Sequence, residues 1–251
     1  MIQTSDNYWT LNKYLKTLST KGNNLLSDKN MVMIDRICKS ISDARNCISK
    51  IDPETSEGKD ILEYKGMTGT KTRHLYNNML SYIDDVRYLE IGTWYGSSSI
   101  SAIYKNKVQA LFIDNWSQFG GDPNIFMEAL QKYEGDSDLY LIENNCWEVE
   151  LNSLDKKFNI YLYDGGHTES DHYKSLEYYL PILDDTFVFM VDDWCWGDVR
   201  DGTMRAIRDL GLKIHFRHEE FLSSDDLIGM PKHKGKESWW NGVAIFLLSK
   251  S

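Results

Sequence analysis

Apolar runs of strand length alternate with stretches of helical pattern from residue 87 onward, and this alternation constrains the fold more than any other feature of the sequence. A chain that repeats strand and helix in this way forms a parallel sheet with helices packed on its faces. We therefore expect an α/β fold with a doubly wound, mostly parallel sheet of seven strands. The expected strands are residues 87–91, 109–114, 138–142, 158–164, 186–192, 212–217 and 243–249, and the expected helices are residues 97–105, 123–133, 168–180 and 198–210.

The amino-terminal part of the chain is helical rather than alternating. Apolar residues at intervals of three and four indicate an amphipathic helix that Pro53 brings to an end, with the seam Ile34, Ile37, Ile41, Ala44 and Ile48. We expect this seam to pack on its own domain, and a contact in a homodimer is the alternative. The chain is accordingly divided into a helical segment or lid, residues 1–75, and a second domain, residues 76–251.

Composition and charge exclude several classes of partner. The 251 residues, 41% of them hydrophobic, are enough to bury one sizeable core. Acidic residues outnumber basic ones by 38 to 28, so nucleic-acid binding is not expected. No apolar stretch approaches membrane-spanning length and no export signal is present, so we expect a soluble, cytoplasmic protein. The scattered cysteines are expected to be reduced thiols: Cys38, Cys47, Cys146 and Cys195.

The stretch from Arg87 to Ser99 has the pattern of a strand, a tight turn and a helix. Glu90 falls near the carboxyl end of the strand, and Gly92 and Gly96 lie where a chain turning into a helix passes close to a ligand. Ser97 can cap the helix that follows. The spacing Glu-x-Gly-x-x-x-Gly differs from Gly-x-Gly-x-x-Gly, whose glycines bind a pyrophosphate. We therefore expect a ligand without phosphate at this edge of the sheet.

Further residues at strand ends suit a nucleoside. Asp114 ends the second strand about twenty residues after the glycine turn, where a carboxylate can accept both hydroxyl groups of a ribose. Trp116 offers a flat face to an adenine ring, and the third strand runs into Asn145 and Cys146. A second loop rich in glycine and threonine, residues 65–73, contains Thr68 and can fold over the same crevice.

Two later strands each end in acidic residues, Asp164 on one and Asp192 with Asp193 on the other. A single crossover helix, residues 168–180, would make these strands parallel neighbours, so all three carboxylates would meet at one sheet edge. Three like charges are unfavourable together unless a cation joins them, and oxygen ligands suit Mg²⁺ or Mn²⁺. The alternative is that Asp192 and Asp193 simply begin the next helix.

The stretch from Leu89 to Ser97 resembles the first motif of class I S-adenosylmethionine (SAM) dependent methyltransferases. This resemblance implies a Rossmann-like sheet with an antiparallel last strand. Where that pattern usually has an acidic residue near the adenine amino group, this chain has Asn145, whose amide oxygen can still accept a hydrogen bond. The residues expected to bind SAM are Thr68, Glu90, Gly92, Gly96, Ser97, Asp114, Trp116, Asn145, Cys146 and Asp164.

The spacing of the later acidic residues resembles metal-dependent O-methyltransferases, including catechol O-methyltransferase and, more closely, the macrolide-sugar O-methyltransferases. In the latter an Asp-Gly-x-His segment supplies a metal ligand and a histidine base, which match Asp164 and His167. The later acidic pair followed by an aromatic residue matches Asp192, Asp193 and Trp194. The resemblance implies that these three aspartates hold the metal. It also gives His167 and Asp193 catalytic roles.

The sequence thus predicts an enzyme that uses SAM and a divalent metal to methylate a hydroxyl group of a sugar or glycan-type small molecule, including a nucleotide-linked sugar. Trp194 and Trp196 are expected to contact this acceptor by stacking. The alternatives are a catechol-like or phosphoryl-bearing acceptor, and a SAM-binding module without turnover. A nicotinamide-dependent oxidoreductase would need the glycine pattern for phosphate, which the sequence lacks, and would leave the three aspartates unexplained.

Overall fold

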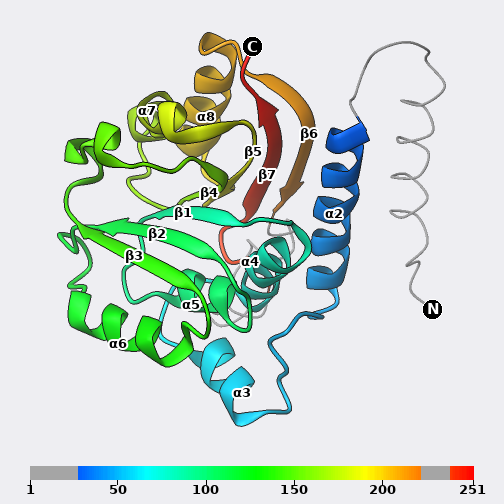
Figure 1. The fold of residues 1–251 in the computed structure, drawn as a ribbon, viewed down its shortest axis with the longest axis vertical. Coiled ribbons are helices and arrows are strands. Elements are labelled where there is room, and N and C mark those ends of the chain that lie inside the picture. Colours follow the sequence, from blue (N-terminus) through cyan, green and yellow to red (C-terminus); the bar gives the residue numbers. More distant parts are fainter. Residues whose placement is uncertain (1–27, 222–237) are drawn as a thin grey trace.

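The computed structural model describes residues 28–221 and 238–251, and its centre is a single twisted sheet (Figure 1). The strand order is β3-β2-β1-β4-β5-β7-β6. The first five strands in this order are parallel, and β7 runs antiparallel to both β5 and β6. The strands are β1 (Arg87–Ile91), β2 (Gln109–Asp114), β3 (Asp138–Glu143), β4 (Phe158–Tyr163), β5 (Leu183–Asp192), β6 (Lys213–Glu220) and β7 (Val243–Ser249).

The helices occupy the intervals between the strands and the stretch before β1. All four helices predicted after residue 97 are present, with ends that differ from the predicted ends by at most a few residues. The predicted seven-stranded α/β fold is therefore confirmed. The helices are α2 (Asp28–Arg45), α3 (Ser56–Glu63), α4 (Thr70–Tyr82), α5 (Ser97–Ile103), α6 (Pro123–Tyr133), α7 (Glu169–Tyr179) and α8 (Gly197–Asp209).

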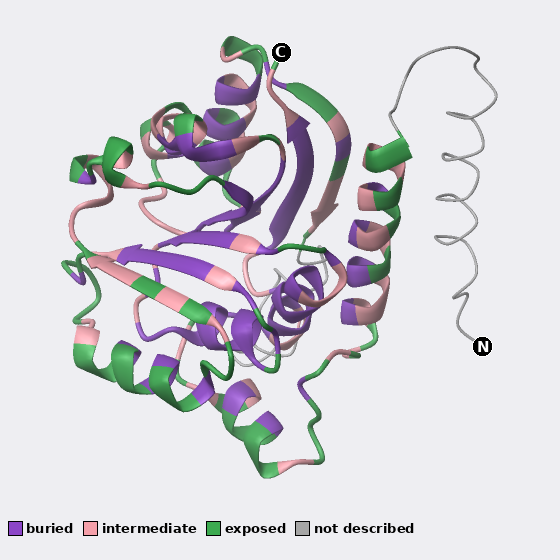
Figure 2. Cartoon of the chain, in the orientation of Figure 1, coloured by how far each residue is buried: buried purple, intermediate pink, exposed green. Residues whose placement is uncertain are grey.

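Alternation along the strands divides the core into two layers, one on each face of the sheet. Phe112 and Leu162 point to the face covered by α2, α4, α5 and α6, whereas Ile113, Tyr161 and Phe189 point to the face covered by α7 and α8. Because the central strands are buried on both faces, they consist mainly of apolar residues (Figure 2). This burial fixes the strand register, since a slip of one residue would exchange the two faces.

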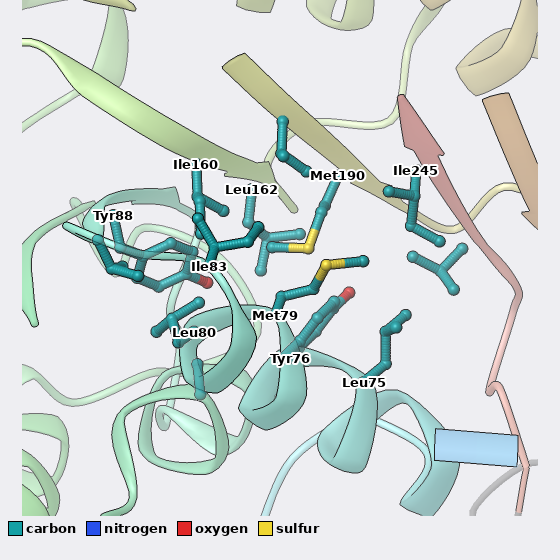
Figure 3. Close-up of a cluster of buried hydrophobic side chains, with 14 of the residues drawn as sticks. Leu75, Tyr76, Met79, Leu80, Ile83, Tyr88, Ile160, Leu162, Met190 and Ile245 are labelled. Atoms are coloured by element: carbon teal, nitrogen blue, oxygen red, sulfur yellow. The ribbon is translucent and has the colours of Figure 1, made fainter. Parts of the chain in front are cut away.

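Helix α4 lies directly on the centre of the sheet (Figure 3). It presents one apolar face to β1, β4, β5 and β7, and each fully buried side chain of this kind contributes about 1.5 to 3 kcal/mol by leaving water. The contact consists of Leu75, Tyr76, Met79, Leu80 and Ile83 against Tyr88, Ile160, Leu162, Met190 and Ile245. The predicted division between residues 75 and 76 stays a prediction, although α4 runs across it.

The apolar seam of α2 packs on α4 of the same chain, as the first interpretation expected. Ile34, Ile37 and Ile41 are buried in the core layer that contains α4. One expectation was wrong: the helix ends at Arg45, well before Pro53, and Ile48 is 56% exposed. The backbone turns at Cys47, which has a φ of 54°, and this turn carries Ile48 away from the seam.

No helix within residues 28–221 or 238–251 combines the length and apolar character needed to cross a membrane. The four cysteines are free thiols of intermediate exposure: Cys38, Cys47, Cys146 and Cys195.

Candidate active site

A cavity of about 400 Å³ opens at the carboxyl edge of the parallel strands. Its wall consists of the loops that follow β1 to β5, the loop that precedes α4 and the turn that precedes β7. Cavities of this size accommodate a cofactor or a small substrate, and the carboxyl edge is where open α/β sheets bind ligands. The predicted site residues in its wall are Thr68, Gly92, Ser97, Asp114, Trp116, Asn145, Cys146, Asp164, His167, Asp192, Asp193 and Trp196.

The turn between β1 and α5 requires glycine at two positions. Gly92 has a φ of 85°, and a Cβ atom there would lie 2.0 Å from the carbonyl oxygen of Asp164. The absence of a side chain therefore lets the turn pass against the end of β4. Gly96 has a φ of 92° and is the N-cap residue that precedes α5. It lies outside the cavity wall, where an added Cβ would meet the ring of Phe126. Gly96 thus shapes the turn without lining the cavity.

Glu90 lies behind the turn rather than in the cavity. Its carboxylate is fully buried and accepts hydrogen bonds from the hydroxyl groups of Ser98 (2.5 Å), Ser99 (2.9 Å) and Tyr88 (2.8 Å). Burial raises the pKa of Glu90 to about 7, and the three hydroxyl donors oppose this rise. The prediction that Glu90 lines the donor pocket is therefore wrong. This side chain instead fastens the start of α5 to β1.

Asp114 organises the same turn from the end of β2. Its Oδ2 accepts hydrogen bonds from the backbone N–H groups of Thr93 (2.7 Å) and Trp94 (2.8 Å), and its Oδ1 accepts one from the N–H of Trp116 (2.8 Å). Asp114 also faces the cavity, as predicted. The indole N–H of Trp116 donates to the Trp94 carbonyl at 2.7 Å, so this ring is held rigidly in the wall.

The loop after β3 brings Asn145 and Cys146 into the wall. The side-chain oxygen of Asn145 accepts a hydrogen bond from the N–H of Trp147 (3.1 Å), and the Cys146 carbonyl accepts one from the hydroxyl of Tyr179 (2.6 Å). Burial raises the pKa of the Cys146 thiol to about 12, so this cysteine is a neutral wall residue rather than a nucleophile. Trp147 also lines the cavity and was not predicted from the sequence.

The glycine- and threonine-rich loop reaches the cavity through Thr68. Its Oγ1 lies 2.8 Å from the Oγ of Ser97, and both residues are buried. Arg73 stabilises this loop through hydrogen bonds to backbone carbonyls, a role that was not predicted from the sequence. The Arg73 guanidinium donates to the carbonyl groups of Thr68 (3.0 Å), Ile61 (2.7 Å) and Tyr64 (2.9 Å). Burial lowers the pKa of Arg73 to about 10.

Three potential metal ligands meet at the ends of β4 and β5. Each offers one ligand atom, and the three atoms lie within 4.8 Å of one another; the residues are Asp164, His167 and Asp193. His167 Nε2 is 2.7 Å from Asp193 Oδ2, yet this buried nitrogen makes no hydrogen bond of acceptable direction. An imidazole lone pair and a carboxylate oxygen repel each other at this distance unless a positive charge compensates them. The cluster therefore fits a divalent cation.

Asp192 lines the same cavity but lies outside this close cluster. Its Oδ1 accepts a hydrogen bond from the hydroxyl of Tyr76 at 3.3 Å. Burial, with the charge of neighbouring carboxylates as a second cause, raises the pKa values of Asp164 and Asp192 well above their usual range. A bound cation would relieve this repulsion. The role of Asp192 as a metal ligand stays a prediction.

His167 is positioned by the start of α7 and by a tryptophan. Thr168 and Asp171 form a capping box at the helix start, so His167 directly precedes the cap. The His167 ring lies 4.9 Å, between centroids, from the ring of Trp196. Trp196 is 45% exposed and lines the cavity, as expected of a residue that contacts an acceptor.

Trp194 does not have the predicted role. It is fully buried and packs edge-on against Phe246, with ring centroids 5.6 Å apart. The left-handed backbone of Asp193, with a φ of 55°, turns the chain so that Trp194 returns to the core and Trp196 faces outward. Later in the chain, Trp239 is likewise buried, whereas Trp240 lines the cavity. Asn241, also in the wall, was not predicted.

Comparisons with known proteins agree with this fold. No protein-family model matches the sequence, and no curated protein matches it. Among solved structures, a candidate caffeoyl-CoA O-methyltransferase from Staphylococcus aureus is 17% identical, with a TM-score of 0.54 over 84% of this chain and 98% of its own. The O-methyltransferase TomG from Streptomyces achromogenes is 14% identical, with a TM-score of 0.46 over 99% and 100% of the two chains. The chain thus has the Rossmann-like fold of class I methyltransferases.

Proposed function

We propose that this protein is a SAM-dependent O-methyltransferase that uses a divalent metal. A single observation carries the proposal: one cavity holds the Gly92 turn and Asp114 on one side and the cluster of Asp164, His167 and Asp193 on the other. A donor bound along the first side would present its methyl group to an acceptor bound at the second. The class I methyltransferase fold supports this arrangement.

The donor side suits SAM. Asp114 offers carboxylate oxygens to the ribose hydroxyl groups, and Trp116 and Asn145 stand beside the expected adenine. Gly92 lines this side of the cavity, where the amino-acid part of the donor would lie. The sulfonium of SAM is positive, and the carboxylates of the cavity attract it.

The acidic cluster suits metal-assisted removal of a proton. Asp164 and Asp193 would hold Mg²⁺ or Mn²⁺, with Asp192 as a further ligand. When bound, this cation lowers the pKa of an acceptor hydroxyl group and offsets the carboxylate charge. His167 would take the proton, and Asp193, whose Oδ2 lies 2.7 Å from Nε2, would stabilise the imidazolium that results. Because the methyl donor is already activated, the other task of these residues is positioning, which contributes up to about 7 to 11 kcal/mol.

The acceptor is a sugar or another polyhydroxylated small molecule. Trp196 lies beside His167, so a sugar ring stacked on this indole would bring a hydroxyl group near the His167 ring. Within the described residues, the wall contains no lysine or arginine, which favours a neutral acceptor over a phosphoryl-bearing one. Catechol-like acceptors and a SAM-binding module without turnover are the alternatives.

The test is release of S-adenosylhomocysteine from SAM with free sugars, nucleotide-linked sugars and catechols, each with Mg²⁺ and with a chelator. We expect turnover with a sugar and its loss in chelator. His167→Ala should lower turnover about 10²- to 10⁴-fold, the usual range for a general base, with SAM affinity unchanged. His215→Ala is the matched control, because His215 contacts Ser249 on β7 and does not line the cavity.

Full activity in chelator would exclude the metal from the mechanism. SAM binding without turnover on any acceptor would favour the non-catalytic module. A fully active His167→Ala variant would transfer the role of base to water or to Asp193.

A further inference from the structure

Both carboxylate oxygens of Asp193 have a partner, and the two partners come from different parts of the chain. Oδ2 faces His167 Nε2 at 2.7 Å, whereas Oδ1 accepts a hydrogen bond of 2.6 Å from the side-chain amide of Asn241. Asn241 therefore holds the Asp193 carboxylate at the rotation angle that directs its other oxygen toward the histidine. Without this donor, the carboxylate could rotate about its last bond.

Asn241 is itself fixed by a turn at the start of β7. The Gly242 N–H donates to the Trp239 carbonyl (3.0 Å), and Gly242 has a φ of 87°. The same turn holds the loop after β5 by its backbone, because the N–H groups of Trp194 and Cys195 donate to the carbonyls of Gly242 (3.2 Å) and Asn241 (2.8 Å). Asn241 thus binds the segment that contains Asp193 through both its side-chain amide and its backbone carbonyl.

The turn is also anchored on the start of α4. The N–H of Lys71 donates to the carbonyl of Ser238 at 3.0 Å, and a Cβ on Gly69 would lie 2.3 Å from that carbonyl oxygen. Gly69 directly follows Thr68, whose hydroxyl contacts Ser97 on the donor side of the cavity. The turn that contains Asn241 is therefore hydrogen-bonded to the loop after β5 and to the start of α4. These two segments lie on the acidic side and the donor side of the cavity.

We propose that Asn241 is a positioning residue that orients Asp193 for metal binding and for its contact with His167. Asn241 acts through Asp193 rather than on the donor. The inference rests on the proposed metal-dependent function and extends it to a residue 48 positions beyond Asp193 in the sequence. Residues that orient a metal ligand usually affect metal affinity about 10- to 100-fold.

The test compares Asn241→Leu with the wild-type protein. Leucine has nearly the size of asparagine but cannot donate a hydrogen bond. The variant therefore removes the hydrogen bond to Asp193 and keeps a side chain of similar volume. Asn241→Ala is the second variant, and it keeps the test decisive if leucine prevents folding. Asn46→Leu is the matched control, because Asn46 is an exposed asparagine whose amide donates to the Ser42 carbonyl, remote from the cavity.

Calorimetry with Mn²⁺ and, separately, with S-adenosylhomocysteine gives the two binding constants without measuring turnover. We expect Asn241→Leu and Asn241→Ala to weaken Mn²⁺ binding about 10- to 100-fold, with S-adenosylhomocysteine affinity within about twofold of wild type. If the folded variants bind Mn²⁺ with wild-type affinity, the positioning role of Asn241 is wrong, whereas the proposed metal-dependent function is unaffected. An equal loss of both affinities would overturn this role too, since it would indicate general damage. Absence of Mn²⁺ binding by the wild-type protein would instead overturn the proposed metal function.

Discussion

The carboxyl groups around the cavity differ in what surrounds them. Glu90 is enclosed by three hydroxyl donors, whereas Asp164 and Asp193 face His167 and each other. Hydroxyl donors satisfy a carboxyl group in either protonation state, but two neighbouring carboxylates need a cation. The first arrangement suits a structural acid, and the second suits a binding site.

Glu90 makes stability depend on pH. Its pKa of about 7 is higher than its ordinary value, so the folded protein binds this proton more tightly than the unfolded chain. The contribution to stability is complete below the unfolded pKa and is lost as the pH rises through the folded pKa. Between pH 5 and pH 8 the loss from this group is about 2 to 3 kcal/mol.

Glu90→Gln removes this titration. Urea unfolding at pH 5 and pH 8 should therefore show a pH difference smaller by about 2 to 3 kcal/mol in the variant than in the wild-type protein. Other buried carboxyl groups titrate in both proteins, so their effect cancels. Glu134→Gln, at an exposed position, should keep the wild-type pH dependence. Parallel curves for Glu90→Gln and wild type would show that the Glu90 pKa is ordinary.

Among the elements, α2 and α4 join the amino-terminal part of the chain to the sheet. The seam of α2 is covered by α4 of the same chain, so it is part of the core rather than a free surface. Ile37 is fully buried in this layer, whereas Val32 on the same helix is 51% exposed.

Ile37→Ala should lower the free energy of unfolding by about 2 to 5 kcal/mol, because it removes a buried side chain and leaves a cavity. Val32→Ala should change it by no more than about 0.5 kcal/mol. Urea unfolding measures both, and light scattering should give the same mass for the two variants and the wild type. A smaller species of unchanged stability in Ile37→Ala would contradict the intramolecular packing and favour the homodimer.

The elements were largely predictable because each strand and helix after residue 87 has a local pattern of its own. The residues at strand ends, such as Asp114 and Asp164, followed from the same reasoning, since parallel strands share one carboxyl edge. Contacts between distant segments were not predictable. Asn241 and Arg73 act on residues whose position only the folded chain defines. Both Trp194 and Trp196 were predicted to contact the acceptor, and the burial of Trp194 depends on the left-handed backbone of Asp193, which no apolar pattern indicates.

At the scale of the whole molecule, loops that follow different strands of the sheet form different parts of the cavity wall. The loops after β1, β2 and β3 form the side proposed to bind the donor, and the loops after β4 and β5 form the acidic side. Since β1 and β4 are adjacent in the sheet, the two sides meet where Gly92 passes against Asp164. In the proposed function, this adjacency would place a methyl donor next to an acceptor bound at the acidic cluster.

A crystal structure with S-adenosylhomocysteine and Mn²⁺, with the metal located by its anomalous signal, tests this account most directly. We predict that S-adenosylhomocysteine lies along Gly92 and Asp114 with its sulfur toward the acidic cluster. The Mn²⁺ peak should lie between the carboxylates of Asp164 and Asp193. A fully occupied donor site with no Mn²⁺ at this cluster, or a donor bound outside the cavity, would contradict the account.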